Sequence, residues 1–190
     1  MRIQILMRLF LNPENKTYLR EMAKEFGASP GQLREELSHL SEAEILQSER
    51  VGRQVFYRAN KQHSLFPELN SMVRKAMGMD RILDSIVGRL GDLQKAVLID
   101  DYAEGRDSGL IDLVLLGKVD HDNLRDLTRK TEQYIGRRIR TLVYELGDVA
   151  EFNNLVATRP HLQLWERGES LKARNEPGEL ELISFTGSAK

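Results

Sequence analysis

The feature that most constrains this chain is a stop and start signal at residues 27–30, between two short amphipathic segments. Before the signal, apolar residues recur at helical spacing and end at Gly27, which tolerates the positive φ that terminates a helix. After it, the hydroxyl of Ser29 can cap a new helix, and Pro30 suits the first helical position because its nitrogen carries no hydrogen. The stretch therefore predicts two short helices joined by a tight turn.

The second predicted helix, over residues 30–43, has one apolar and one polar face. Leu33, Leu37 and Leu40 recur at the spacing of a buried face. The outward face carries amide, guanidinium, hydroxyl and imidazole groups, on Gln32, Arg34, Ser38 and His39. These groups suit contacts with DNA base edges and phosphates.

The residues after this helix predict a basic β-hairpin. Two short alternating stretches, 47–50 and 54–58, flank a turn that contains Gly52. No acidic residue occurs from Arg50 to Pro67, whereas Arg53 and other basic residues fall inside that range. A basic hairpin beside a helix-turn-helix is typical of a winged helix that binds DNA. The alternative is a solvated hairpin without a partner.

Composition and charge limit the function classes. The chain has 190 residues, 41% hydrophobic and 30% charged, and this composition is typical of soluble proteins of one large or two small domains. A net charge of -1 argues against a general polyanion binder. The absence of cysteine excludes thiolate metal sites and disulfides, and the four histidines lack zinc-ligand spacing. We expect a cytoplasmic protein with no membrane segment, no metal and no cofactor.

The rest of the chain predicts an α+β protein with three segments. A helix over residues 1–11 precedes the helix-turn-helix, and helices over 66–77 and 80–90 follow the hairpin. Strands are expected at 95–99, 110–116 and 138–145, with helices capped by Asp120 and by Asp148 with Glu151. Residues 162–166 are expected to be helical, and an edge strand is expected near 180–185. The predicted domains are 1–65, a helical linker or dimerisation segment 66–91, and a small α/β domain 92–190.

The segment 100–117, DDYAEGRDSGLIDLVLLG, resembles the signature of minimal nucleotidyltransferases of the DNA polymerase beta superfamily. That signature has a Gly-Ser pair, a Tyr-Ala-Arg-Gly-like turn and an Asp-x-Asp strand. The matching residues are Tyr102, Ala103, Gly105, Asp112 and Leu113, together with Gly136–Ile139 and Val143–Tyr144. The resemblance implies a nucleotidyltransferase-like fold for the C-terminal domain.

This chain departs from the signature where the chemistry takes place. Two metal ions need carboxylates at positions i and i+2 of one strand, and here these positions hold Leu110 and Asp112. Asp100 and Asp101 replace the Gly-Ser pair, and Glu104 replaces the arginine of the turn. The residues of this degenerate site are Asp100, Asp101, Gly105, Leu110, Asp112 and Glu145.

We therefore expect that the chain is not an enzyme, has no catalytic residues and does not bind magnesium-ATP. Asp112 is expected to be satisfied by backbone amides or by an arginine such as Arg106. A metal site rebuilt by Asp100, Asp101 or Glu145 stays open as an alternative.

The N-terminal half is similar to winged helix-turn-helix regulators of the ArsR-like type. Arg50, Gly52, Arg53 and Tyr57 stand where the wing of that family has them. The resemblance implies a sequence-specific regulator that binds double-stranded DNA as a homodimer, and the combination of both domains is similar to a two-domain bacterial and archaeal family. The candidate DNA-binding residues are Arg20, Ser29, Gln32, Arg34, Ser38, His39, Arg50, Gly52, Arg53 and Tyr57.

Under this interpretation the C-terminal domain serves dimerisation, the sensing of a small-molecule effector, or binding of a protein partner. One alternative is an active nucleotidyltransferase that uses the winged helix to hold its substrate. A second alternative is an antitoxin-like module that interacts with another protein.

Overall fold

The computed structural model describes residues 1–168, and these residues form a mixed α+β structure with two sheets. The predicted edge strand near 180–185 lies outside the described residues. The N-terminal part contains helices α1 (Arg2–Phe10), α2 (Leu19–Phe26) and α3 (Pro30–Glu42), and strands β1 (Thr17–Tyr18), β2 (Leu46–Val51) and β3 (Gln54–Ala59). Its antiparallel sheet has the order β1-β3-β2, so the two-residue β1 pairs with the inner strand of the hairpin.

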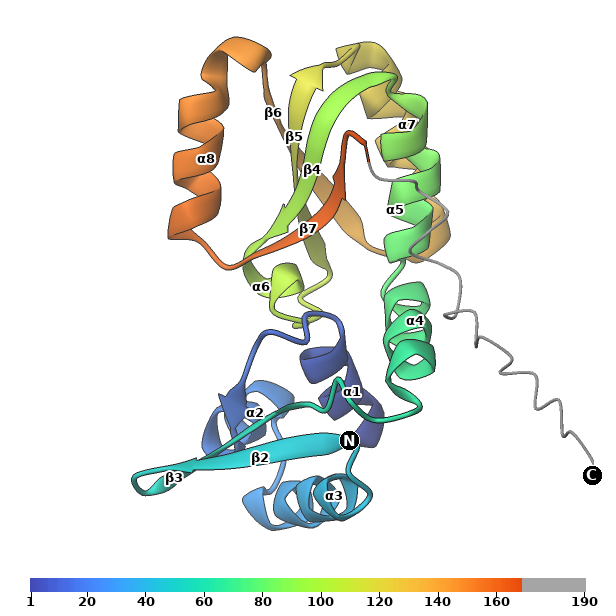
Figure 1. Ribbon diagram of the computed structural model, residues 1–190. Coiled ribbons are helices and arrows are strands. Elements are labelled where there is room, and N and C mark those ends of the chain that lie inside the picture. The colour runs from blue at the N-terminus through green and yellow to red at the C-terminus, as the bar shows by residue number, and fades with distance from the viewer. Residues whose placement is uncertain (169–190) are drawn as a thin grey trace, which may run out of the picture.

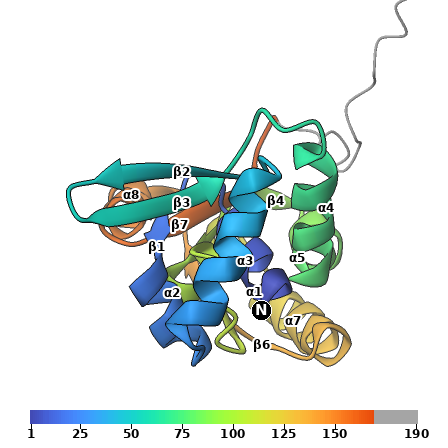
Figure 2. The same ribbon diagram turned by 90° about the horizontal axis from the view of Figure 1, so that it is seen from below.

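The turn between α2 and α3 forms as its residues predict. Gly27 has φ 60°, and the following amide donates back to the carbonyl of Ala23 at 3.0 Å. The Ser29 hydroxyl accepts from the Gln32 amide at 3.4 Å at the start of α3. Leu37 and its neighbours on the same face are fully buried, which leaves the other face of α3 exposed (Figure 2).

A helical connection runs from the N-terminal part to the second sheet. Helix α4 (Phe66–Ala76) lies beside α1, and α5 (Met79–Ser85) with the 3-10 helix η1 (Val87–Arg89) lies against the second sheet (Figure 1). Gly78 separates α4 from α5 with φ 79°, and a Cβ there would approach the side chain of Ile135 to 3.0 Å. A glycine therefore suits this close junction.

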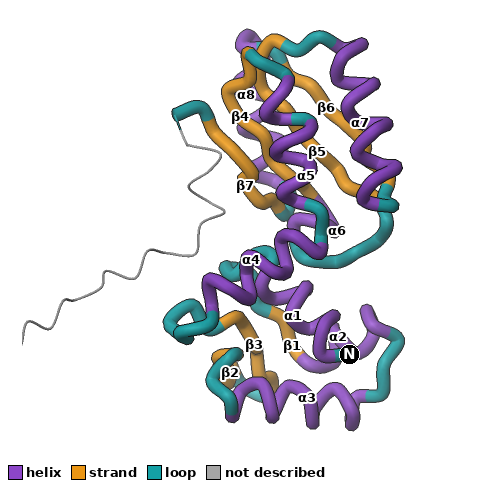
Figure 3. The backbone as a smooth tube through the Cα atoms, turned by 90° about the vertical axis from the view of Figure 1, so that its right-hand side faces the viewer, coloured by secondary structure: helices purple, strands orange, loops and turns teal. Residues whose placement is uncertain are grey.

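Within residues 1–168 the second sheet has four strands in the order β6-β5-β4-β7, and only its β5–β6 pair is parallel. Helices α5 and α7 cover one face, and α8 covers the other (Figures 1 and 3). The elements are β4 (Asp92–Ile99), α6 (Asp100–Ala103), β5 (Leu110–Lys118), α7 (His121–Ile135), β6 (Arg138–Tyr144), the 3-10 helix η2 (Leu146–Asp148), α8 (Val149–Thr158) and β7 (His161–Glu166).

One hydrophobic cluster extends through both parts of the molecule, from Ile5 and Leu33 to Leu98 and Leu115. A smaller cluster around Phe152 packs between α8 and the other face of the second sheet. Among the described residues no helix is long and apolar enough to cross a membrane. The division into segments 1–65, 66–91 and 92–190 stays a prediction.

Two local predictions were wrong. Residues 161–166 form strand β7 rather than a helix, because Leu162 and Leu164 alternate with polar residues against β4. Asp148 does not cap α8 through its side chain; its carboxylate instead accepts from the amide of Glu145, within η2. By contrast, Asp120 caps α7 as predicted and accepts from the two following amides.

Candidate functional site

A groove of about 690 Å³ lies between α2, α3 and the β2–β3 hairpin. Four of the predicted DNA-binding residues line it: Arg20 from α2, Arg34 from α3, Arg53 from the hairpin turn and Tyr57 from β3. The apolar part of the lining comes from Tyr18, Leu19, Val51 and Val55. The fold thus brings together guanidinium groups that are up to 33 positions apart in the sequence (53 − 20).

The three arginines of this groove are exposed, and none of them forms an ion pair or hydrogen bond with another described residue. Most other arginines behave differently: Arg2, Arg106 and Arg159, for example, each contact a carboxylate. Like charges that converge without counter-ions create a positive potential, and this potential attracts an anionic partner.

The other residues predicted to bind DNA from α3 and its N-cap differ in whether their side chains already form local hydrogen bonds. Gln32 and His39 are exposed on the outward face of the helix. The Ser38 hydroxyl donates to Glu42 at 2.8 Å, and the Ser29 hydroxyl is used for capping. Local hydrogen bonds therefore already engage both serine hydroxyls.

The hairpin turn presents the remaining predicted residues. Gly52 has φ 61° and a Cβ would meet no described group there within 4 Å, so its role is conformational. Arg50 donates to the Gly52 carbonyl at 3.4 Å, whereas Arg53 is unrestrained. Figure 2 shows the hairpin projecting beyond α3. Arg53 is thus the better placed of the two arginines to meet a partner.

A second constellation lies where β4 ends and β5 begins. Asp112 is 7% exposed, and its carboxylate accepts from Nε of Arg140 at 2.5 Å. The parallel register of β5 and β6 places these two residues side by side. The prediction that Arg106 pairs with Asp112 was wrong, because Arg106 contacts Asp101 and Glu104 instead. Sequence reasoning missed Arg140 because the pair depends on strand register.

Asp100 lies in the same cluster. The strand partners Ile99 and Asp112 place it near the start of β5, and its carboxylate contacts Arg159 at 3.1 Å. The hydrogen bond and charge of Asp112, together with the charge of Asp100, raise the pKa of Arg140. Asp100 also has φ 59°, a left-handed conformation at a position where the resemblance implies glycine.

The other predicted residues of the degenerate site occupy different places. Leu110 opens β5 two residues before Asp112, on the same side of the strand. Gly105 is buried against α1, and Asp101 is exposed beside Arg106. Glu145 lies beyond the far end of β6, about 16 Å along the strand from the level of Asp112 at ~3.3 Å per residue, so it does not join the cluster.

The cluster therefore consists of two carboxylates, each held by an arginine. Within residues 1–168 no group of three or more histidine, aspartate or glutamate side chains could hold a metal ion. An incoming cation would have to compete with guanidinium groups for Asp100 and Asp112.

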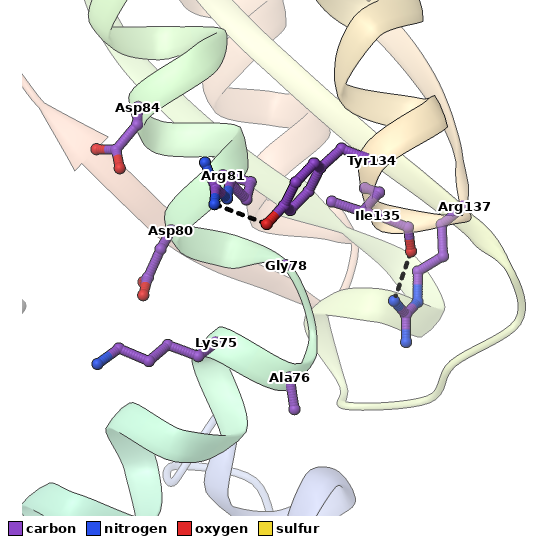
Figure 4. A pocket seen from close by; sticks show the side chains of 9 residues that line it. All are labelled: Lys75, Ala76, Gly78, Asp80, Arg81, Asp84, Tyr134, Ile135 and Arg137. Carbon is purple, nitrogen blue, oxygen red and sulfur yellow. Dashed lines mark hydrogen bonds between the residues drawn. The ribbon is translucent and has the colours of Figure 1, made fainter.

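A further hollow of about 580 Å³ lies at the α4–α5 junction, beside the end of α7 (Figure 4). Arg81 lies 4.1 Å from the centre of the Tyr134 ring and donates to its hydroxyl at 2.7 Å. Arg137 donates to the Ile135 carbonyl and to Asp107. None of the predicted site residues lines the hollow, and both of its arginines already have partners.

Comparisons with known proteins give a limited likeness. No family model and no curated protein matches the chain. Among solved structures, the chain is similar to a tri-AMPylated Shewanella oneidensis HEPN toxin in complex with MNT antitoxin, at 16% identity over 52% of this chain and 77% of that chain, with a TM-score of 0.36. It is also similar to a toxin–antitoxin complex with AMP-PNP, at 18% identity over 51% of this chain and 80% of that chain, with a TM-score of 0.38.

A toxin–antitoxin structure of an MntA-HpeT mutant matches at 16% identity, again over 51% of this chain and 80% of that chain, with a TM-score of 0.38. The expectation that the chain is not an enzyme is corrected, because it conflicts with the descriptions of these neighbours, which name a tri-AMPylated toxin and AMP-PNP.

Proposed function

We propose that this chain binds double-stranded DNA as a winged helix-turn-helix regulator, with α3 and the β2–β3 hairpin as its contact surface. The observation that carries the proposal is the groove in which Arg20, Arg34 and Arg53 converge without counter-ions among the described residues. An exposed helix beside a basic hairpin matches the way such proteins meet a duplex, with the helix in the major groove.

The side chains available on this surface divide between base readout and backbone contact. Gln32 and Arg34 carry the groups that pair bidentately with adenine and guanine edges, and His39 lies exposed on the same helix. Arg20 and Arg53 flank the helix and are placed to meet phosphates, with Arg50 behind Arg53 in the hairpin. Phosphate contacts would supply most of the affinity, and the α3 contacts the specificity.

Exposed apolar residues support the proposal that the chain acts as a homodimer. Ile3 on α1 is 70% exposed, and Leu65 and Met72 at α4 are 53% and 54% exposed. Two copies joined there would present two hairpins to two half-sites. Light scattering at several concentrations tests this; a monomer at all concentrations, with and without DNA, would contradict it.

The DNA-binding proposal is tested by fluorescence anisotropy with a duplex selected from a random-sequence library. Arg53→Ala is expected to weaken binding by about threefold or more at low salt, because it removes a groove cation. The matched control is Arg89→Ala, which removes another exposed arginine, in η1, with no ion pair among the described residues. Absence of wild-type binding, or equal loss in both variants, would refute the proposal.

A second candidate is nucleotidyl transfer, favoured by the proximity of Asp100 and Asp112 at adjacent strand ends. Its test is the transfer of radiolabel from ATP with Mg²⁺ or Mn²⁺, to nucleic acid or to protein. Transfer that Asp112→Asn abolishes would support it, and absence of transfer with both metals would remove it. A protein that co-purifies with the chain while DNA affinity is absent would favour the antitoxin-like alternative.

A further inference from the structure

The two parts of the molecule meet at a buried arginine on α1. Arg8 is 2% exposed, and its guanidinium contacts Glu25 at 3.1 Å and Glu21 at 3.7 Å, both on α2. The same guanidinium donates through Nη1 to the carbonyl of Glu104 at 2.5 Å. Burial raises the pKa of Glu25 although Arg8 acts in the opposite direction. One side chain thus ties α2 to the turn that follows α6.

The backbone of that turn lies directly against α1. A Cβ at Gly105 would come within 2.6 Å of the Met7 carbonyl oxygen and 2.8 Å of the Arg8 carbonyl oxygen. The side-chain amide of Asn12, two residues after α1, donates to the carbonyls of Ala103 and His161, at 3.2 and 3.3 Å. Figure 1 shows α6 just above α1. Only glycine allows this approach, so the contact is specific to position 105.

The contact also borders both candidate sites. On one side, the turn carries Arg106, which pairs with Asp101 and whose charge acts on Glu25. On the other side, Glu21 and Glu25 belong to the helix that carries Arg20 into the DNA-binding groove. A displacement of the turn would therefore move α2 through Arg8, since the buried guanidinium cannot lose its carboxylates without large cost.

We propose that turn 103–106 positions α2, with Arg8 as the positioning residue, so that the C-terminal part of the chain sets the affinity and specificity of the DNA-binding groove. The inference rests on the proposed DNA binding. It assigns to Gly105 and Arg8 a role in binding although neither lines the groove. Changes at Asp100 or Asp101, including the binding of a partner there, would reach the DNA surface by this route.

A matched pair of glycines in the same loop provides the test. Gly105 and Gly109 have similar positive φ values, 82° and 77°, but a Cβ at Gly109 would meet no described group within 4 Å. Alanine therefore imposes a similar backbone strain at both positions, and only Gly105→Ala also disturbs α1. Coupling energies of about 0.5–2 kcal/mol correspond to a loss of about 2- to 30-fold in affinity.

We expect Gly105→Ala to lower the affinity for the selected duplex by that factor while its affinity for random DNA changes less. A smaller fraction of folded protein would lower both affinities equally, so the ratio separates misplacement of α2 from simple loss of stability. Gly109→Ala is expected to leave the ratio within about twofold of the wild type. An unchanged ratio in Gly105→Ala would overturn the inference.

Amide hydrogen exchange of α2 in the full chain gives a readout that does not depend on DNA. Faster exchange at residues 19–26 is expected in Gly105→Ala and not in Gly109→Ala. If the wild type bound no DNA but this difference appeared, the proposed function would be refuted, whereas the positioning of α2 by turn 103–106 would be supported. Equal exchange in both variants would refute the link itself.

Discussion

The groove arginines make a quantitative prediction about the salt dependence of DNA binding. Each phosphate neutralised by a protein cation contributes about 0.9 to the slope of log K against log salt concentration. Arg20, Arg34 and Arg53 line one groove and have no competing carboxylate among the described residues, so each is free to meet a phosphate. Arg20 and Arg53, which are placed to meet phosphates, together contribute about 1.8 to the slope.

The expected losses follow from that slope. Between 50 and 200 mM salt, one phosphate contact costs about 3.5-fold in affinity, and the contacts of Arg20 and Arg53 together cost about 12-fold. The variant with all three groove arginines changed to alanine should therefore lose about 12-fold less affinity over this range than the wild type. Anisotropy titrations at five or six salt concentrations measure both slopes with the same duplex.

Single variants assign the individual contacts. Arg20→Ala and Arg53→Ala should each lower the slope by about 0.9. Arg34→Ala should instead leave the slope nearly unchanged and reduce the preference for the selected sequence if its guanidinium meets a base edge, at about 1–3 kcal/mol. A triple variant that retained the wild-type slope would refute the reasoning, because the groove would then contribute no phosphate contact.

Three further predictions concern stability and pH. Leu37→Ala should lower the free energy of unfolding by about 2–5 kcal/mol in urea titrations, because Leu37 is fully buried on the inner face of α3. Tyr102→Phe should lower the free energy of unfolding by about 1–2 kcal/mol, since the buried Tyr102 hydroxyl donates to the Met77 carbonyl at 2.7 Å. A decrease of less than about 0.5 kcal/mol would contradict this. The hydrogen bond from Arg137 lowers the pKa of Asp107, so this contact stabilises the fold above the ordinary aspartate pKa. Asp107→Asn should lower Tm at pH 7, and the difference should vanish as the pH falls through the lowered pKa.

Local signals in the sequence predicted the N-terminal elements well. Gly27 and Ser29 act within one turn of the chain, and the structure contains both the positive φ and the capping hydrogen bond. The capping of α7 by Asp120 could be predicted for the same reason. Such features depend on a few consecutive residues, so they need no knowledge of the tertiary structure.

Strand β7 shows where a local interpretation fails although the signal was present. Residues 161–166 read HLQLWE, and Leu162 and Leu164 are two positions apart, which is the period of a strand. A segment of six residues is too short for its sequence alone to distinguish the period of a helix from that of a strand, and the pairing with β4 stabilises the strand. The pairing partner is more than 60 residues away in the sequence (161 − 99).

The partner of Asp112 shows the same limit at the candidate site itself. Arg106 is six positions away and was the natural local choice (112 − 106), yet the turn after α6 directs it to Asp101 and Glu104. Arg140 reaches Asp112 because β5 and β6 run parallel with these two residues in register. A parallel pair needs a crossover helix, here α7, so its register depends on the whole β5–α7–β6 unit. The electrostatic state of this carboxylate is therefore a property of the assembled sheet, and any activity at Asp112 depends on whether its substrate can displace Arg140.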